Sequence, residues 1–200
     1  MAFTFFFRDA HVLDLIARHV VPSMAGFSRS RVWDAGCAMG PEAYSLAMVF
    51  AENLGTFGLR NLRIDASDID DDGDFREIVT KGVYPKEVLD RLPEGLLAKH
   101  FDPAPEPGFF QIREEIRSRV VFHRHDLLSL NPVGSGYQLV VCKNVLLHFH
   151  PEERVAVVRM FHDALAPGGY FATEQTQKLP EGLEGLFEQV SPDWQLFRRS

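Results

Sequence analysis

The sequence lacks several features that would define other classes of protein. It holds only two cysteines, Cys37 and Cys142, which are far apart and form no pair with metal-binding spacing. No apolar run approaches the roughly 20 residues that a membrane-spanning helix needs. Acidic residues outnumber basic ones, 28 to 21, and the formal net charge is −7. We therefore expect apolar, reduced cysteines, a cytoplasmic protein, no direct membrane insertion and no nucleic-acid partner.

The amino-terminal stretch MAFTFFFRD is aromatic, but it has neither a basic leader nor a small-residue cleavage site, so we expect no signal peptide. Its phenylalanines, at positions 3, 5, 6 and 7, are expected in the core or in a lid. Arg8 follows them and needs a partner. A carboxylate bound in a pocket and a surface salt bridge both satisfy that need.

Apolar periodicity predicts alternating strands and helices. Helical spacing covers 41–55, where Pro41 suits the first helical position and Gly55 the end. A second helix is expected over 151–166, ended by the PGG sequence at 167–169. The predicted strands are 31–37, 62–70, 119–128, the start of 137–149, 170–176 and a final strand at 194–199.

The early strands are nearly continuous apolar runs, which is typical of a parallel sheet covered on both faces. We predict one α/β domain over residues 1–200, with a doubly wound, mostly parallel sheet in the order 3-2-1-4-5. An insert of helices and a small β-hairpin is expected at about 82–118. Ligands of such sheets bind outside the carboxyl ends of the strands. Polar or glycine-rich clusters follow the predicted strands at 34–42, 66–70, 125–127 and 142–148.

The first cluster contains two glycines, Gly36 and Gly40, which would allow close approach of a ligand to the backbone. It fails the dinucleotide pattern G-x-G-x-x-G because position 38 is alanine, and it lacks the lysine of a phosphate-binding loop. Glu42 disfavours a phosphate but suits the cationic amino group of a methionine-type cofactor. A plain strand–helix turn is the alternative.

Acids follow the second and third strands. Asp68 is the candidate acceptor for ribose hydroxyls. The run from Asp68 to Gly73 also matches half of a calcium loop, but position 79, where the bidentate glutamate would fall, is Val79. Asp126 would accept from an adenine amino group with Leu127 beside the ring, or it would simply cap a turn.

Lys143 and Asn144 follow the fourth strand and are expected at the pocket mouth, where the amide of Asn144 suits a zwitterionic amino acid. Two histidine pairs, at 123 and 125 and at 148 and 150, lie on strands that the predicted order separates by about 14 Å, at about 4.8 Å per strand step. Zinc–nitrogen bonds of about 2 Å make a shared metal site unexpected.

Taken in order, these segments resemble the CheR family of chemotaxis receptor glutamate methyltransferases, which use S-adenosylmethionine. The similar stretches are FTFFFRDAHVLDLI, RVWDAGCAMGPEAYSLAM, IDASDID, KGVYPKEVLDRLPEGLLAKHF, VVFHRHDLL, LVVCKNVLLHF and ALAPGGYF. The resemblance extends from about residue 3 to the end of the chain. It implies a class I methyltransferase sheet with a small β insert.

The resemblance implies that Thr4 and Arg8 touch the cofactor, that Glu42 lies near its amino group and that Asp68 lies on its ribose. Arg8 would also orient the acceptor carboxylate, and His148 would line the path of the methyl group. The residues that the patterns and the resemblance together assign to the cofactor are Thr4, Arg8, Gly36, Glu42, Asp68, Asp126, Leu127, Lys143 and Asn144.

The sequence departs from the family pattern in several places. Lysine replaces arginine at Lys143, aspartate replaces asparagine at Asp126, and Pro41 and Ala43 alter the start of the helix. His148 stands where the family has tyrosine, and histidine would be able to deprotonate a hydroxyl or amine acceptor. The sequence does not include the helical domain that usually precedes this core. The expectations are a protein-glutamate methyltransferase, a methyltransferase for a small-molecule acceptor, or a catalytically silent sensor or scaffold that binds S-adenosylmethionine.

Overall fold

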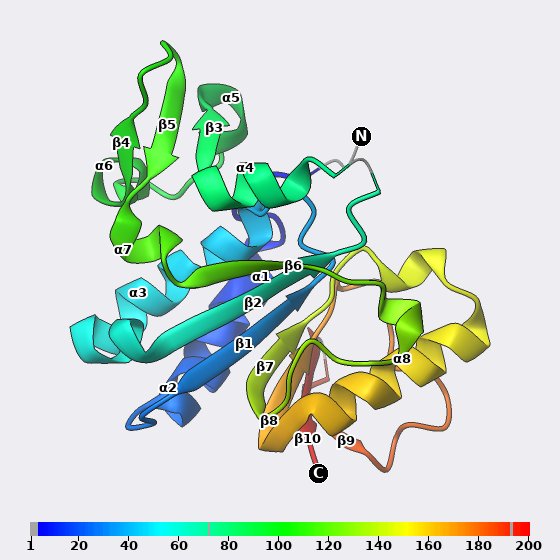
Figure 1. Cartoon of the computed structure of the whole chain (residues 1–200). Helices are drawn as coiled ribbons and strands as arrows, with labels where there is room; N and C mark the ends of the chain where they lie inside the picture. The colour runs from blue at the N-terminus through cyan, green and yellow to red at the C-terminus, as the bar shows by residue number, and fades with distance from the viewer. Residues whose placement is uncertain (1–3, 72, 193) are drawn as a thin grey trace.

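A mostly parallel sheet forms the centre of the computed structural model, which describes residues 4–71, 73–192 and 194–200 (Figure 1). Over these residues the main sheet has seven strands in the order β6-β2-β1-β7-β8-β10-β9. The first five run parallel, while β10 is antiparallel to β8 and to β9. The α/β fold and the predicted 3-2-1-4-5 order are confirmed. The bounds are β1 (Ser30–Ala35), β2 (Leu62–Asp68), β6 (Val120–Arg124), β7 (Tyr137–Val141), β8 (Leu165–Ala172), β9 (Phe187–Ser191) and β10 (Trp194–Arg199).

Helices cover both faces of this sheet because side chains that alternate along each strand are apolar on both sides. Val32 of β1 belongs to the core under the amino-terminal helices, whereas Trp33 belongs to the core under α8. The first face carries α1 (Ala10–Leu15), the π-helical turn η1 (Ile16–Val20), α2 (Val21–Met24) and α3 (Pro41–Asn61), and the second carries α8 (Pro151–Ala164).

Helix α3 runs further than the predicted 41–55, to Asn61. The helical backbone is nevertheless interrupted at Gly55, whose φ of 67° and ψ of 177° lie outside the helical region. Glycine adopts such angles without the steric penalty that a Cβ brings. Gly55 therefore ends the first helical piece, and a short second piece continues to the start of β2.

The insert contains a small antiparallel sheet in the order β3-β5-β4, which lies apart from the main sheet (Figure 1). The predicted hairpin corresponds to β4 and β5, and β3 extends it on the free edge of β5. A strand of three residues ending in proline is too short to show alternation. The insert elements are β3 (Val83–Pro85), α5 (Lys86–Leu89), α6 (Leu96–His100), β4 (Phe101–Pro103), β5 (Phe109–Ile112) and α7 (Glu114–Arg117), preceded by α4 (Phe75–Lys81).

Most of the predicted strands have different bounds in the structure. The strand expected over 119–128 ends at Arg124 and gives way to a 3₁₀ turn, η2 (Leu127–Ser129). The one expected from 137 ends at Val141, before a second turn, η3 (Leu146–His148). The strand expected at 170–176 is β8, which starts earlier and has irregular register near its PGG sequence.

The amino-terminal segment, residues 4–9, joins the insert to the main domain. Phe6 is fully buried, and its ring lies edge-on to Tyr84 at 5.0 Å and to Phe101 at 5.7 Å. The backbone N–H of Phe7 donates to Ser45 Oγ of α3 at 2.9 Å. The aromatic run is therefore core in part, while Phe3 lies outside the described residues.

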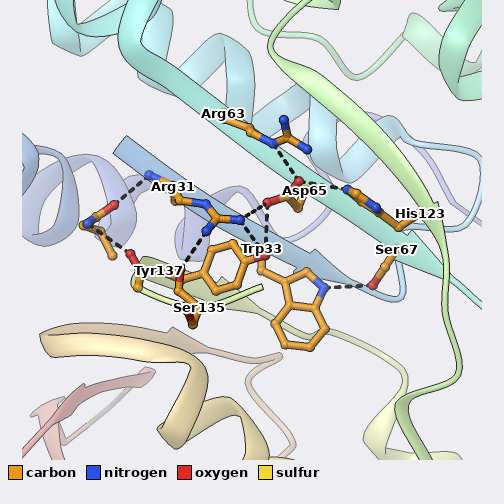
Figure 2. A network of polar contacts seen from close by, with 10 residues as sticks. Arg31, Trp33, Arg63, Asp65, Ser67, His123, Ser135 and Tyr137 are labelled. Atoms are coloured by element: carbon orange, nitrogen blue, oxygen red, sulfur yellow. Dashed lines mark hydrogen bonds and ion pairs between the residues drawn. The ribbon is translucent and has the colours of Figure 1, made fainter. Parts of the chain in front are cut away.

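A buried carboxylate, Asp65 of β2, ties four strands together (Figure 2). It accepts hydrogen bonds from Arg31 at 2.9 Å, Arg63 at 2.8 Å and Tyr137 at 3.0 Å, and it pairs with His123 at 2.8 Å. Burial alone would raise the pKa of Asp65, but the bonds from His123, Arg31, Arg63 and Tyr137 hold it well below its usual range. The order of β6, β2, β1 and β7 is thus fixed by charge as well as by packing.

None of the helices in the described part of the chain is both long enough and apolar enough to cross a membrane. Cys37 and Cys142 are both buried free thiols. Burial raises the pKa of each thiol, so neither is poised as a nucleophile.

Candidate functional site

The loop after β1 turns sharply at the carboxyl edge of the sheet because Gly36 has a φ of 97°. A Cβ on Gly36 would lie 2.2 Å from Val145 Cγ2, so the site excludes any side chain here. The N–H groups of Gly36 and Cys37 both donate to Ser67 O, at 2.7 and 3.0 Å. Gly36 therefore permits both the tight turn and the close packing of Val145, which together shape the surface at this edge of the sheet.

A cavity of about 300 Å³ opens at this edge of the sheet, at the point where the strand order reverses. Size does not single it out, since a hollow of about 520 Å³ lies at the amino ends of β1 and β2. Its position and chemistry do, because residues after β1, β2, β6 and β7 meet in its wall. The lining consists of Gly36, Ser67, Asp68, Ile69, His125, Asp126, Leu127, Leu128, Val145, His148 and Phe149.

Asp68 lies in the cavity wall at the end of β2, at the position predicted for a ribose-binding acid. Its Oδ2 accepts from Ala38 N at 2.9 Å and its Oδ1 accepts from Asp70 N at 3.2 Å. Asp70 is not among the residues that line the cavity, and its carboxylate accepts from Phe75 N, at 3.0 Å, at the start of α4. Each Asp68 oxygen keeps lone-pair capacity for a ligand hydroxyl, since an ionised carboxylate accepts about four hydrogen bonds.

Asp126 and Leu127 also line the cavity, from the end of β6. Asp126 Oδ1 accepts from Leu128 N at 2.9 Å, so the turn-capping role weighed in the sequence is present. The Asp126 side chain is exposed, and within the described residues the hydrogen bond from Leu128 N engages Oδ1 and leaves Oδ2 able to accept from a ligand. Leu127 is buried and contributes an apolar wall.

Lys143 does not lie at the pocket mouth, as the sequence had suggested, because its side chain is only 2% exposed. Its Nζ pairs with Glu42 Oε2 at 3.0 Å and with Asp9 Oδ2 at 3.5 Å, and it donates to Arg8 O at 3.2 Å. Burial would lower the pKa of Lys143, but the carboxylates of Glu42 and Asp9 outweigh burial and raise it. Glu42 is therefore neutralised by a partner that the sequence alone did not reveal.

Asn144 follows Lys143 in a left-handed conformation, with a φ of 59°. Its backbone N–H donates to Glu174 Oε2 at 2.9 Å, and the same oxygen accepts from Thr173 Oγ1 at 2.7 Å. Glu174 is 4% exposed and was missed in the sequence, where it lies within a predicted strand. The signal that could have identified Glu174 was an acid near the end of the fifth predicted strand, which the predicted strand order places next to the fourth.

Thr4 and Arg8 are both half-buried in the amino-terminal segment. The Arg8 guanidinium lies 5.9 Å from the centre of the Phe5 ring, a distance typical of a cation–π contact. Phe7 and Asp9, on either side of Arg8, have φ values of 54° and 55°. Such angles are unfavourable for residues with a Cβ, so the surrounding contacts must hold this turn in place.

His148 is exposed and lines the cavity together with His125. The predicted separation of about 14 Å between their strands does not apply here, since both residues lie beyond the strand ends, in loops that converge. The described residues contain no group of three or more histidines, cysteines and acids arranged to hold a metal ion.

Asp34, the penultimate residue of β1, is a further acid that sequence analysis left without a role. It is 0% exposed, its oxygens meet no hydrogen-bond donor among the described residues, and its carboxyl lies within hydrogen-bonding reach of the Glu42 carboxyl. Burial raises the pKa of Asp34 well above its usual value, and the neighbouring charge of Glu42 raises it further. The D-x-G sequence at 34–36 was the signal, because it puts an acid just before the turn.

Comparison with known proteins decides the family. Residues 2–196 match the family described as CheR methyltransferase, SAM binding domain. The chain belongs to this family. It is 32% identical over 200 residues to chemotaxis protein methyltransferase 1 of Pseudomonas aeruginosa, covering 94% of this chain and 71% of that protein. It is 31% identical over 200 residues to chemotaxis protein methyltransferase Cher2 of Pseudomonas putida, covering 94% and 70%.

A third relative is larger. The chain is 37% identical over 172 residues to an uncharacterized 104.1 kDa protein of Rhodobacter capsulatus, a match that covers 84% of this chain. This chain spans only 18% of that protein. The CheR core therefore also occurs as a small part of a much longer protein.

Proposed function

We propose that the cavity at the carboxyl edge of the sheet binds S-adenosyl-L-methionine and releases S-adenosyl-L-homocysteine. We further propose that the protein methylates glutamate carboxylates of a chemoreceptor-like, methyl-accepting protein. The observation that carries the proposal is the meeting of four strand ends in one cavity, in a chain of the CheR family. The chemotaxis methyltransferases among its relatives support the choice of acceptor.

The residues present fit this cofactor. Leu127, Leu128 and Ile69 give the cavity an apolar wall suited to an adenine ring, and Asp68 offers acceptors for hydroxyl groups. Further along the edge, buried Asp34 and partly buried Glu42 offer carboxyl oxygens that would accept hydrogen bonds from an ammonium group. A phosphate would meet these acids unfavourably.

The cofactor supplies an electrophilic methyl group on a sulfonium. The chain would bind it through Asp68 and the apolar wall, and Val145 and Phe149 would exclude water from the cavity. A glutamate acceptor is already ionised at neutral pH, since its reference pKa is about 4.3, so no general base is required. Arg8 would orient that carboxylate and His148 would line its approach.

Calorimetric titration with S-adenosylmethionine and with S-adenosylhomocysteine tests the cofactor. We expect both to bind, and we expect Asp68→Ala to weaken binding by at least about tenfold, the loss of about one charged hydrogen bond. Asp71→Ala is the matched control, because Asp71 is an exposed acid of the same loop. Absence of binding by the unaltered protein would refute the proposal.

Transfer of a tritiated methyl group into a cell lysate tests the acceptor. We expect label in protein that is released by mild base, as a glutamate methyl ester would be. Base-stable label, or label in small molecules, would point to a different acceptor and to a catalytic role for His148. Cofactor binding without any transfer would leave a sensor or scaffold.

A further inference from the structure

A second hollow lies at the amino ends of β1 and β2, the opposite end of these strands from the cofactor cavity. Its volume of about 520 Å³ is within the range of about 300–1,000 Å³ that is usual for small-molecule sites. This amino-edge hollow is lined by Ser28, Arg29, Ser30, Arg31, Arg60, Asn61, Leu62 and Arg63. Half of these residues are arginines and none is acidic, although the whole chain has a formal net charge of −7. The hollow is therefore a basic site on an acidic protein.

The register of the sheet brings these arginines together. They come from two short segments, SRSR at 28–31 and RNLR at 60–63, which are distant in the sequence. The parallel pairing of β1 with β2 places Arg31 directly beside Arg63. Paired residues of neighbouring strands project from the same face of a sheet. The cluster is thus built by the fold and is not a run of charge along one exposed segment.

One carboxylate offsets the charge of the arginines that line the hollow. Asp65 pairs with Arg31 at 2.9 Å and with Arg63 at 2.8 Å (Figure 2). Arg29 and Arg60 are exposed, and neither side chain has an ion pair or hydrogen bond within the described part of the chain. Four arginines and one carboxylate leave an excess of three positive charges. Like charges that line one hollow repel each other and attract anions.

Part of the cluster is already held in place for a ligand. The Arg31 guanidinium lies 4.7 Å from the centre of the Tyr137 ring. Arg63 is held through its Nε, and within the described residues no hydrogen bond engages its two terminal nitrogens. These nitrogens and the guanidinium groups of Arg29 and Arg60 are the donors left for an anion. A guanidinium that is already oriented loses less conformational entropy when it binds.

The carboxyl end of α3 borders the hollow and would by itself repel an anion, because the last carbonyls of a helix carry partial negative charge. Arg119 offsets this effect. Its Nη1 donates to Arg60 O at 2.8 Å and to Leu59 O at 3.5 Å. The helix end is therefore capped by a different arginine, and the side chain of Arg60 is left available.

The donors and the charge of the hollow indicate the class of anion. A phosphate group carries a charge of about −1.5 to −2 at neutral pH and three accepting oxygens, so two phosphates match the excess charge and a single carboxylate does not. Arginine binds two phosphate oxygens at once, and the hydroxyls of Ser28 and Ser30 and the amide of Asn61 add further donors. No aromatic residue is among those that line the hollow, so charge and not ring stacking would select the ligand.

We propose that the amino-edge hollow binds a small molecule that carries two adjacent phosphate groups. Arg29, Arg60 and the terminal nitrogens of Arg63 bind the phosphate oxygens. This site is separate from the cofactor cavity, because Gly36 and Asp68, which line that cavity, lie at the other ends of the same two strands. Both ligands can therefore be bound at once.

Calorimetric titration with inorganic pyrophosphate, without divalent cations, tests the site. We expect one pyrophosphate to bind per chain, and orthophosphate to bind at least about tenfold more weakly because it offers one phosphate. Raising the salt concentration from about 0.05 to 0.2 M should weaken binding, as screening of exposed charges requires. Saturation with S-adenosylhomocysteine should leave pyrophosphate affinity unchanged, which excludes entry of the anion into the cofactor cavity.

Two single variants test the residues. Arg29→Ala and Arg60→Ala should each weaken pyrophosphate binding by about tenfold, the loss of about one charged hydrogen bond. Both side chains are exposed, so the variants should fold and should bind S-adenosylhomocysteine as the unaltered protein does. Arg159→Ala is the matched control, because Arg159 is an exposed arginine on α8 and does not line the hollow.

Three results would overturn the inference: no binding of pyrophosphate, binding abolished by S-adenosylhomocysteine, or equal losses in Arg159→Ala and in the two hollow variants. Tighter binding of a hexaglutamate peptide than of pyrophosphate would also overturn it and would assign the hollow to an acidic protein segment. Failure of S-adenosylhomocysteine to bind would refute the proposed function and would leave the pyrophosphate result standing.

Discussion

Gly36 illustrates how a single residue position shapes this site. Its φ of 97° excludes most side chains by backbone strain, and Val145 excludes them again by contact at 2.2 Å from a Cβ. Gly26 has a similar φ, 88°, but nothing lies within 4 Å of its Cβ position. A comparison of substitutions at the two glycines therefore separates the cost of the backbone conformation from the cost of the steric overlap.

We expect Gly26→Ala to destabilise the protein by about 1–2 kcal/mol, the usual penalty for a Cβ in a left-handed conformation. Gly36→Ala should lose about 1–3 kcal/mol more, because its steric overlap with Val145 must be relieved. Urea unfolding measures both. Val145→Ala combined with Gly36→Ala should recover part of the second loss. Equal losses for the two single variants would contradict the packing argument.

The sequence predicted the positions of some candidate cofactor-binding residues better than those of others. Asp68, Asp126 and Leu127 were predicted to lie at strand ends, and the structure brings them into one cavity. The ion pair between Lys143 and Glu42 was not foreseeable, since it joins residues that are distant in sequence and depends on the packing of α3. Whether each residue binds the cofactor stays a prediction.

At the scale of elements, the Asp65 network shows how strands are held in order (Figure 2). One side chain that is 1% exposed receives bonds from β1, β6 and β7 as well as from its own strand. Its low pKa means that the ionised form stabilises the native state, fully above the unfolded value of about 3.9 and progressively less below it.

Asp65→Asn should reduce the free energy of unfolding by about 2–3 kcal/mol at pH 7, because Arg31 and Tyr137 lose a charged acceptor. This loss of stability is smaller than the largest losses seen for buried ion pairs. The side chains of Arg31 and Arg63 are 32% and 51% exposed, so water can still solvate them when the carboxylate is removed. The difference from the unaltered protein should shrink as pH falls below about 3.9. Asp163→Asn, at a side chain 72% exposed, is the control, with a change within about 0.5 kcal/mol. A pH-independent difference would contradict the role of the charge.

The major elements were predictable because their apolar periodicity is long. β1, β2, α3 and α8 follow from that pattern alone, and the parallel order follows from their alternation. β3 and β9 were missed, since three or five residues with mixed exposure carry no clear period. The amino-terminal helices were missed although Val12, Ile16 and Val20 recur at helical spacing. The end of the strand predicted over 119–128 was set too late, since β6 stops at Arg124, where loop geometry decides.

At the scale of the whole molecule, contacts between aromatic rings join the insert to the main domain. Phe6 comes from the amino-terminal segment, while Tyr84 and Phe101 belong to the small sheet. Tyr84 also donates to Met39 O at 2.7 Å, in the loop that precedes α3. The insert is thus anchored both to the amino-terminal segment and to the loop between β1 and α3.

Phe6→Ala should lower the free energy of unfolding by about 3–5 kcal/mol, the usual loss for a buried aromatic ring. It should also speed amide exchange in residues 83–112 more than in β1 and β2, because the small sheet loses its packing partner. Phe57→Ala, at a ring 71% exposed, should change stability by less than about 0.5 kcal/mol. Uniform exchange across the chain would contradict a local anchoring role.

The amino-terminal segment is also a short covalent link between the insert and the edge of the main sheet. Phe6 is held in the insert, and Asp9, three residues on, contacts Lys143 in the main domain. Three residues reach about 10 Å at most when fully extended. The length of this segment therefore limits how far the small sheet can move while Asp9 keeps its contact with Lys143. A larger displacement would also disturb the Lys143–Glu42 pair. A load applied to the insert is transmitted to the edge of the sheet through the covalent chain itself.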